Sequence, residues 1–412
     1  MSFAKIYTRG LLGLHAPQIE VEVHISSGLP SLTIVGLPEA AVRESKDRVR
    51  SAIINSGFLF PTKRLTINLA PADLPKDGSR LDLPIALGIL IASGQLPENC
   101  TDGFEFIGEL ALDGHLRPVS GTLTIAMACQ QARHRLLLPT ANLDEASQLP
   151  EFEVYAASHL QQVCAHFLGN SPLKAAPQKS MAASSRYPFD LADVKGQLRP
   201  RRALEIAAAG GHSLLFKGPP GTGKTLLASR LPSILPPLNA QENLEVASIY
   251  SVANAQHTFG QRPFRAPHHT ASAIALVGGG SQPKPGEITL AHLGVLFLDE
   301  LPEFDRKVLE VLRQPLESKE IVISRAARQM TFPANFQFIA AMNPCPCGYA
   351  FNQDSRCQCS PESIQRYQNR ISGPLLDRID LHIDVPPLQA NELQERTPSE
   401  NSETVRQRVM KA

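Results

Sequence analysis

The sequence predicts an α/β protein of two successive domains, the second of which has a central parallel sheet. Along residues 1–166, strand-like runs alternate with helical stretches, a pattern typical of α/β units. From residue 187 to about residue 388 the order is strand, glycine-rich loop, helix and further buried strands. The length of 412 residues is sufficient for two or three domains with separate cores.

The elements of the first domain follow from apolar periodicity. Helical stretches are expected near residues 38–56, 83–93 and 122–133. Residues 167–186 are rich in Ser, Ala, Lys and Pro without an apolar period, which is typical of a linker. A domain boundary is therefore predicted there. The expected strands of the first domain are residues 19–25, 31–35, 64–69, 104–107 and 135–138.

Charge and apolar content limit the possible classes of protein. The formal net charge is +1, so a nucleic-acid surface must be local, on a loop or in a pore. No run of about 18 apolar residues appears. The N-terminal residues also lack the apolar stretch and cleavage site of a signal peptide. We therefore expect a cytoplasmic protein that does not bind membranes.

A glycine-rich segment, GPPGTGKT at residues 218–225, follows the apolar strand 212–216 and precedes the helical residues 226–231. In this order, backbone N–H groups surround the β-phosphate of a nucleotide and the helix N-terminus adds its positive end. Lys224 is expected to reach the β- and γ-phosphates, and Thr225 to offer its hydroxyl to Mg²⁺. The residues expected to bind ATP are Gly218, Pro219, Pro220, Gly221, Thr222, Gly223, Lys224 and Thr225.

Two later strands end in polar residues. Residues 295–298 form an apolar run suited to a central parallel strand, and Asp299 and Glu300 follow it. We expect Asp299 to hold Mg²⁺ and Glu300 to polarise the attacking water. The apolar run 335–343 ends in Asn343, which is expected to orient that water. Taken alone, an Asn at a strand end is more often turn chemistry, so this assignment depends on the first two.

An arginine supplied by a neighbouring subunit accelerates phosphoryl transfer by about 10³ to 10⁵ in systems where it is known. Arg378 is the first candidate for this role, because its segment ends ahead of the apolar strand 381–385. Arg370 is the second candidate. The alternative is a surface salt bridge from Arg378 to Asp377 or Asp380.

Four of the seven cysteines form two CxC pairs within residues 345–359. Four thiolates this close together can surround one tetrahedral Zn²⁺, which would be structural because no position is left for water. Four reduced surface cysteines are the main alternative, although exposed clustered thiols oxidise readily. An iron–sulfur cluster is a minor alternative. The expected zinc ligands are Cys345, Cys347, Cys357 and Cys359.

Two segments are candidates for contact with DNA. Residues 319–332 have β-branched arms around Arg325 and Arg328, the pattern of a hairpin with a basic tip that can follow phosphates without reading sequence. A solvated, charged edge strand is an equally good interpretation of this pattern.

The second candidate segment begins with residues 260–270 and is expected to be a long, mobile, loop-rich insertion that contains Arg265 and Lys284. Both cations are candidates for DNA contact, with the same alternative of a solvated edge. His268 and His269 are adjacent, which suits metal chelation poorly, so local hydrogen bonding is expected for them.

The order of these motifs resembles the ComM/YifB family of magnesium-chelatase-like AAA+ proteins, and the match runs from residue 1 to about residue 388. The motifs that carry the resemblance include SGPLLDRIDLH, and two of them, RPFRAPHH and NPCPCGY, are more specific than a generic ATPase motif. The family implies a homo-hexameric ring that acts in branch migration of DNA during natural transformation. The chain would then be a helicase or translocase on single-stranded or branched DNA, with recombination proteins as candidate partners. The resemblance implies Lys224 and Thr225 as Walker A, Asp299 and Glu300 as Walker B, Asn343 as sensor 1 and Arg378 as the trans-acting arginine.

Two other functions are compatible with a P-loop domain. A chelatase-type ATPase would push a protein partner to insert a metal into a tetrapyrrole, but the first domain and the cysteines match the ComM pattern instead. A nucleotide-dependent scaffold without turnover conflicts with the presence of Glu300. Proteins of the family continue into a helical lid with a further ATP-sensing arginine. Residues 389–412 are expected to be only the start of that lid, so this arginine cannot be assigned.

The first domain is similar to the proteolytic domain of Lon and to the Lon-like domain of RadA, through residues 69–78 (LAPADLPKDG) and 107–118 (IGELALDGHLRP). Lon continues PKDGPSAG, with Ser as nucleophile, whereas this chain has Arg80 at that position. Leu123 occupies about the position of the general base Lys. Ser79, one position away, would have no base beside it. We therefore expect a non-proteolytic scaffold or DNA-contact domain.

Overall fold

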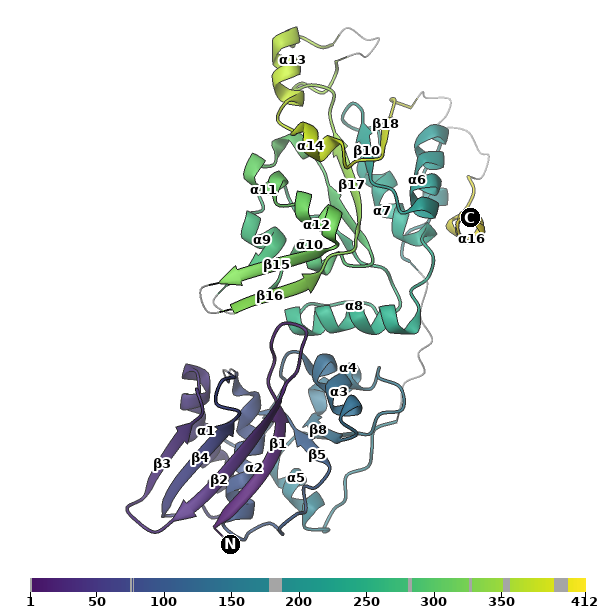
Figure 1. Ribbon diagram of the computed structural model, residues 1–412. Coiled ribbons are helices and arrows are strands. Elements are labelled where there is room, and N and C mark those ends of the chain that lie inside the picture. Colours follow the sequence, from purple (N-terminus) through teal and green to yellow (C-terminus); the bar gives the residue numbers. More distant parts are fainter. Residues whose placement is uncertain are drawn as a thin grey trace. The chain divides into compact units, whose positions relative to one another are not determined.

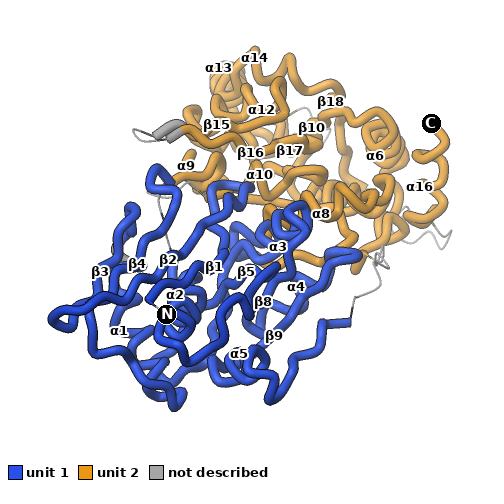
Figure 2. Tube along the Cα trace, turned by 60° about the horizontal axis from the view of Figure 1, so that its bottom comes forward, with its two compact units in different colours: residues 1–181, 251–255 blue, residues 182–250, 256–412 orange. Residues whose placement is uncertain are grey.

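The computed structural model describes residues 2–74, 76, 78–177, 187–280, 284–325, 328–350, 356–388 and 399–412. The chain forms two compact units, residues 1–181 with 251–255 and residues 182–250 with 256–412 (Figure 2). Each unit contains an α/β fold, as the sequence predicts.

A mixed sheet forms the centre of the first unit (Figure 1). Its strands are β1 (Phe3–Arg9), β2 (Gln18–Ser26), β3 (Ser31–Val35), β4 (Arg64–Ala70), β5 (Phe104–Phe106), β8 (Arg135–Pro139) and β9 (Val154–Ala157). In the described part of this unit the order is β3-β4-β2-β1-β5-β8-β9. The pairs β1/β2 and β2/β4 are antiparallel, and the other neighbours are parallel. A separate antiparallel pair consists of β6 (Glu109–Leu110) and β7 (Leu116–Arg117).

A buried helix packs against this sheet. The helices of the unit are α1 (Ala40–Asn55), α2 (Asp82–Ala92), α3 (Thr122–Gln131), α4 (Leu143–Ala146) and α5 (Leu160–Phe167). Every residue of α2 is buried, and the helix packs on β1 and β2. A Cβ atom on Gly88 would lie 2.6 Å from Cγ2 of Val23, so glycine allows the helix to approach the sheet closely.

The five strands and three helices predicted for this unit are confirmed, whereas β1, β6, β7, β9, α4 and α5 were not predicted. The first half of the predicted linker, residues 168–177, also belongs to this unit. The N–H of Ala176 donates to the carbonyl oxygen of Val154 at 2.8 Å, and Ala175 forms a bridge with Tyr155. Linker composition did not reveal this backbone pairing. The other half of the predicted linker, residues 178–186, lies outside the described residues.

A parallel sheet forms the centre of the second unit. Its strands are β10 (Leu214–Lys217), β11 (Phe264–Arg265), β14 (Val295–Leu298), β17 (Gln337–Met342) and β18 (Leu381–Asp384). Their order is β11-β14-β17-β10-β18, with every neighbouring pair parallel. All residues of β14 and β17 are buried, as expected for central strands of a parallel sheet.

In the described part of the second unit, helices and two hairpins surround the sheet. The helices are α6 (Leu198–Gly210), α7 (Lys224–Ile234), α8 (Ala240–Ala253), α9 (Ala273–Val277), α10 (Glu287–Leu290), α11 (Arg306–Glu310), α12 (Arg313–Ser318), α13 (Pro361–Gln368), α14 (Gly373–Leu376) and α16 (Ser402–Lys411). The hairpins are β12 (Gly278–Gly279) with β13 (Lys284–Pro285), and β15 (Glu320–Arg325) with β16 (Arg328–Pro333). The predicted long insertion is thus not only loop: it contains α9, β12, β13 and the edge strand β11.

The C-terminal helix α16 packs against α6 and α7. Val405 and Val409 join the same apolar core as Leu214 and Phe297 of the sheet. The helical character predicted for this segment is confirmed for residues 402–411, and residues 389–398 lie outside the described residues. Within the described part of the chain, no helix has both the length and the apolar character needed to cross a bilayer.

Candidate active site

The glycine-rich loop of residues 218–223 joins β10 to the first turn of α7. Gly221 and Gly223 have φ angles of 77° and 86°, which glycine adopts without steric cost. A Cβ atom on Gly218 would lie 2.2 Å from the carbonyl oxygen of Val385, so no larger residue fits there. The loop thereby curves closely before α7, whose N-terminus is suited to bind phosphate.

Lys224, the first residue of α7, folds back over this loop. Its Nζ donates to the carbonyl oxygens of Gly218 at 2.7 Å and Pro219 at 2.8 Å. It also donates to Oδ1 of Asn343 at 3.1 Å. Lys224 is only 8% exposed, and this burial lowers its pKa. The ammonium group is therefore held over the place where the loop would receive a phosphate.

Thr225 and Asp299 form a direct pair beside Lys224. The hydroxyl of Thr225 donates to Oδ2 of Asp299 at 2.6 Å, and Oδ1 of Asp299 accepts from the N–H of Glu300 at 2.9 Å. Hydroxyl, carboxylate and phosphate oxygens are the ligands that Mg²⁺ prefers. The two side chains therefore fit the predicted magnesium site, and Asp299 is placed there by the end of β14.

The register of the sheet explains why these residues meet. Leu214 of β10 pairs with Ile339 of β17, and Val295 of β14 pairs with Gln337 of β17. Because these strands are parallel, their carboxyl ends lie at one edge of the sheet. The residues that follow the three strands are thus brought together at the loop, as their order in the sequence predicted: Lys224 and Thr225, Asp299 and Glu300, and Asn343.

Glu300 makes a contact that the sequence did not predict. Its Oε2 lies 3.1 Å from Nδ1 of His269, and its backbone has the left-handed φ of 52°. The ring of His269 packs against that of His268, with centroids 4.1 Å apart, and meets the ring of Phe304 edge-on at 6.4 Å. The expected catalytic carboxylate is therefore in contact with the segment that follows β11.

The expectation of local hydrogen bonding is confirmed for His268 and wrong for His269. His268 Nδ1 lies 2.9 Å from Oγ1 of Thr270, two residues away, whereas His269 reaches the end of β14. β11 pairs in parallel with β14 through Phe264 and Val295. Recognition of β11 as a strand would therefore have indicated that the residues after it lie near the end of β14. Two residues are too short a run for apolar periodicity to indicate a strand.

A second unpredicted contact comes from Gln197, which precedes α6. Its Nε2 donates to the carbonyl oxygen of Pro386 at 2.8 Å and to that of Thr222 in the glycine-rich loop at 3.3 Å. Gln197 is buried and has a left-handed φ of 50°. This side chain joins the start of α6, the loop and the end of β18. No local pattern around a single glutamine predicts such a role.

The two candidate arginine fingers are both paired within the chain. Arg378 donates to Glu317 of α12 and to the carbonyl oxygen of Pro374. The expected alternative partners, Asp377 and Asp380, are therefore not the observed one. Arg370 donates to Glu303 at 2.8 Å and to the carbonyl oxygen of Pro302 at 3.2 Å. A contribution of either arginine to a neighbouring subunit's nucleotide stays a prediction.

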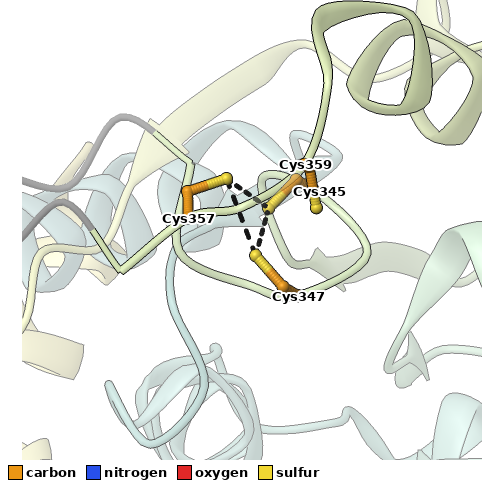
Figure 3. A group of neighbouring side chains, drawn as sticks. All are labelled: Cys345, Cys347, Cys357 and Cys359. Carbon is orange, nitrogen blue, oxygen red and sulfur yellow. Dashed lines mark hydrogen bonds between the residues drawn. The ribbon is translucent and has the colours of Figure 1, made fainter.

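The four clustered cysteines converge in space (Figure 3). Their sulfur atoms all lie within 4.8 Å of one another, with Cys345 3.3 Å from Cys347 and 3.7 Å from Cys357. A tetrahedral site with Zn–S bonds of about 2.3 Å requires sulfur separations of about 3.8 Å. The backbone N–H of Tyr349, followed by Cys345, lowers the pKa of Cys347 to about 6. The cluster therefore fits zinc, although residues 351–355 between the CxC pairs lie outside the described residues.

The basic hairpin predicted for residues 319–332 is present as β15 and β16. Arg325 pairs with Arg328 at its end, so both backbones flank the tip as expected. Residues 326–327, and the side chains of residues 324–328, lie outside the described residues.

The other two candidate DNA contacts differ from each other. Arg265 donates to both carboxylate oxygens of Glu287, at 2.6 Å and 2.7 Å. This pairing fastens β11 to α10, and a contact of Arg265 with phosphate, which would require its release from Glu287, stays a prediction. Lys284 is exposed at the start of β13, which is compatible with the predicted role.

In the first unit, the residues at the Lon-like positions are buried or paired. Ser79 donates to Glu109, and Arg80 is 8% exposed. Leu123 is fully buried, and its N–H donates to Oε1 of Glu145 at 3.1 Å. Asp82 is fully buried and accepts from Nε of Arg48 at 2.9 Å. No lysine stands at the position of Leu123. The partner of Ser79 is the carboxylate of Glu109 and not an amine that could act as a general base.

Comparisons with known proteins relate both units to a single family. Residues 190–393 match the family described as "Magnesium chelatase, subunit ChlI", and residues 21–142 match "Subunit ChlI of Mg-chelatase". The protein YifB of Salmonella typhimurium is 52% identical over 416 residues, which cover 100% of this chain and 82% of YifB.

Two other relatives extend this comparison. The competence protein ComM of Haemophilus influenzae is 51% identical over 419 residues, which cover 100% of this chain and 82% of ComM. Lon protease 2 of Bacillus subtilis is 27% identical over 176 residues, which cover 39% of this chain and 31% of that protease. The first two matches include every residue of the site described above, whereas the third is limited to a part of the chain.

Proposed function

The chain belongs to the ComM/YifB family of magnesium-chelatase-like AAA+ proteins, and from this premise we propose that it is a DNA motor driven by ATP hydrolysis. The observation that carries the proposal is the meeting of Lys224, the Thr225–Asp299 pair, Glu300 and Asn343 at the glycine-rich loop. These groups provide each function that hydrolysis of a nucleoside triphosphate requires.

In the proposed reaction, Lys224 exchanges the carbonyl oxygens of Gly218 and Pro219 for oxygens of the β- and γ-phosphates. Thr225 and Asp299 would hold Mg²⁺, which would neutralise part of the phosphate charge when bound. Asn343 and Glu300 position a water whose oxygen attacks the γ-phosphorus, while the bond to the β–γ bridging oxygen breaks and ADP leaves. Glu300 accepts the proton of the water and returns it to solvent.

We propose that the site is completed between subunits of a homo-hexamer. Arg378 is the residue proposed to reach the neighbour's γ-phosphate, and its partner Glu317 would have to release it. Such an arginine stabilises the charge that develops on the phosphoryl oxygens. Hydrolysis in one subunit is then coupled to contact with the next, as a ring motor requires.

DNA is the proposed track. The name of the competence protein ComM, to which this chain is 51% identical, supports a role in competence. The activity that we propose within that role is that of a helicase or branch-migration motor in natural transformation or recombination. Arg325 and Arg328 flank the tip of the hairpin of β15 and β16, where cations can follow single-stranded or branched DNA. Lys284 is the other proposed contact.

One observation favours a second candidate function. Both family matches are described by a magnesium chelatase subunit, so the same ATPase could remodel a protein partner instead of moving DNA. The two functions share the chemistry at Lys224 and Glu300, and differ in what stimulates it.

A direct test measures ATP hydrolysis by the purified protein with single-stranded DNA, with forked DNA and without DNA, together with strand exchange on the fork. Lys224→Ala is the control that should abolish both activities. We expect DNA to stimulate hydrolysis and the fork to be exchanged only with ATP. Hydrolysis that DNA never stimulates would replace the DNA motor by the remodelling ATPase.

We also propose that the four cysteines hold one structural Zn²⁺ per chain. All four sulfur atoms are close enough to bind a single ion, and a site of four thiolates has no open position for catalysis. Elemental analysis should find about one zinc per chain in the wild type and almost none in Cys347→Ser/Cys357→Ser. Iron in place of zinc, or no metal in freshly purified protein, would contradict this assignment.

A further inference from the structure

A small groove in the first unit combines positive charge with an apolar floor. It has a volume of about 210 Å³ and is formed by α1, the start of β3 and the residues that lead into β4. Lys46, Arg50 and Lys63 provide charge along the groove, and Phe60 and Leu32 provide apolar surface. Neither the ATPase reaction nor the Lon-like motif involves any of these residues.

Among the described residues, Lys46 and Lys63 lack the carboxylate partners that several other cations of this unit have. Lys5, Arg9 and Arg48 are each bound to a carboxylate. In the described part of the chain, by contrast, no ion pair is formed by Lys46 or Lys63. Asp47 is the one acid among the described residues that line the groove, so its lining carries a net charge of about +2.

The positions of the cations follow from the secondary structure. Lys46 and Arg50 are four residues apart on α1, so their side chains lie on the same face of the helix. Lys63 comes from the short connection ahead of β4, on another wall. Positive charge therefore faces the groove from two elements, as in a site that holds a phosphate between them.

Phe60 gives the groove a fixed aromatic surface. Its ring packs against the core of the unit, and the guanidinium carbon of Arg50 lies 5.4 Å from the ring centroid. Because Arg50 lies over the ring, a nucleobase would stack on the Arg50 side of this pair, as bases stack on aromatic rings and guanidinium planes in proteins that bind single strands. Because the core holds the ring, little conformational entropy is lost when a base binds.

We infer that this groove binds one nucleotide of single-stranded DNA, with its phosphates at Lys46 and Lys63 and its base against Phe60 and Arg50. The inference rests on the proposed function, and gives the first unit the task of holding DNA that the second unit moves. The groove, at about 210 Å³, is smaller than the pockets of about 300 to 1,000 Å³ that enclose a drug-sized ligand, so a bound nucleotide would lie partly outside it, as a nucleotide within a strand can. A nucleotide within a strand and a free nucleotide share this chemistry, so the experiment must distinguish them.

The test measures binding of a fluorescent oligothymidylate to the full chain by anisotropy over a series of salt concentrations. Lys46→Gln/Lys63→Gln is compared with Arg133→Gln/Lys174→Gln, which removes two exposed cations of the same unit that do not line the groove. We expect the groove variant to raise the Kd about tenfold and to reduce the salt slope by about 1.4, or 0.7 per lost phosphate contact. The control variant should change neither quantity.

Phe60→Leu keeps the apolar contact with the core but removes the flat ring, and it should raise the Kd about fivefold without altering the salt slope. A strand that contains 5-iodouracil should photo-cross-link to the tryptic peptide of residues 51–63, which contains Phe60. Competition by excess thymidine monophosphate as effective as that by the oligonucleotide would show a free-nucleotide site and overturn the assignment to a strand.

The outcomes separate this inference from the proposed function. If the groove and control variants bind DNA equally, while DNA still stimulates ATP hydrolysis, the groove is not the site and the motor stands. If the wild type neither binds DNA nor responds to it, both are overturned. Thermal unfolding of each variant confirms that a weaker Kd does not reflect loss of the fold.

Discussion

The segments around Lys224 and Ser79 both place polar side chains at the start of a buried helix, but these side chains differ in their partners. Near Ser79, polar side chains have side-chain partners: the hydroxyl of Ser79 donates to Glu109, and Asp82 forms an ion pair with Arg48. At Lys224, the ammonium contacts the carbonyl oxygens of the loop that would hold phosphate.

This difference distinguishes a structural network from a site prepared for a ligand. Arg48 and Asp82 neutralise each other, so neither has charge left for a substrate. Lys224 has only neutral oxygens as hydrogen-bond partners, and Thr225 and Asp299 present oxygens to the same place. An anionic phosphate with Mg²⁺ supplies the charges that these groups lack, so binding costs no existing ion pair.

Arg378 is an exception to this difference, because it belongs to the unit where we propose catalysis and is already paired with Glu317. If it is the arginine finger, Arg378→Ala should reduce the rate of ATP hydrolysis by about 10³-fold or more. Arg370→Ala, which removes a partly exposed ion pair with Glu303, should reduce it less than about fivefold.

Mixing the inactive variants Arg378→Ala and Lys224→Ala should restore part of the hydrolysis, because some interfaces then combine an intact loop with an intact arginine. A mixture that stays inactive, although both variants assemble, would show that Arg378 does not act between subunits.

The second prediction compares the two segments directly. Lys224→Ala should reduce the catalytic rate by about 10² to 10³, since it removes a preorganised cation from the transition state. Ser79→Ala should change that rate less than about twofold, because its partner Glu109 belongs to a structural network. Phosphate release measures both, and unfolding curves verify folding. A large catalytic defect in Ser79→Ala would contradict the comparison.

The third prediction concerns the cost of burying the network in the first unit. Burial, opposed by the ion pair with Arg48, raises the pKa of Asp82 to about 6, above its ordinary value of 3.8. The native state therefore binds the proton more tightly than the unfolded state. This contribution to stability is present below about pH 4 and is lost as the pH rises through about 6.

We expect the free energy of unfolding of the wild type, relative to Asp82→Asn, to fall by roughly 2 to 3 kcal/mol between about pH 4 and pH 7. Denaturant unfolding at the two pH values measures this difference, and comparison with the variant removes the contributions of other titrating groups. A difference that rises with pH would mean that Arg48 stabilises the carboxylate by more than burial destabilises it.

Sequence patterns predicted the parts of the molecule that local chemistry determines. The glycine spacing of residues 218–223 and the apolar runs before Asp299 and Asn343 were sufficient to predict which side chains meet, because parallel strands align their carboxyl ends. The convergence of the four cysteines followed from their closeness in the chain.

The contacts that the sequence did not reveal join segments without a periodic pattern. Glu317 contacts Arg378 across 61 residues, and Gln197 contacts the loop and Pro386 across up to 189 residues. Arg265 is a similar case, since its charge was visible in the sequence but its partner Glu287 was not. Pairing between distant side chains depends on tertiary packing, which composition does not encode.

The smallest predicted effect concerns His269, the one described side chain in contact with the carboxylate of Glu300. Glu109 in the first unit binds Ser79, for which we propose no reaction. His269, by contrast, would position Glu300, which accepts a proton in the proposed reaction. His269→Ala should reduce kcat about fivefold, which corresponds to the loss of one hydrogen bond of about 1 kcal/mol. The KM for ATP should be unchanged, because Lys224 and the loop still bind the nucleotide.

His269→Asn, whose amide nitrogen can replace Nδ1, should recover most of the rate. His268→Ala is the matched control, since His268 bonds to Thr270 instead of an acid. Equal defects in the two alanine variants would assign both histidines to loop packing, and would leave Glu300 oriented by its backbone alone.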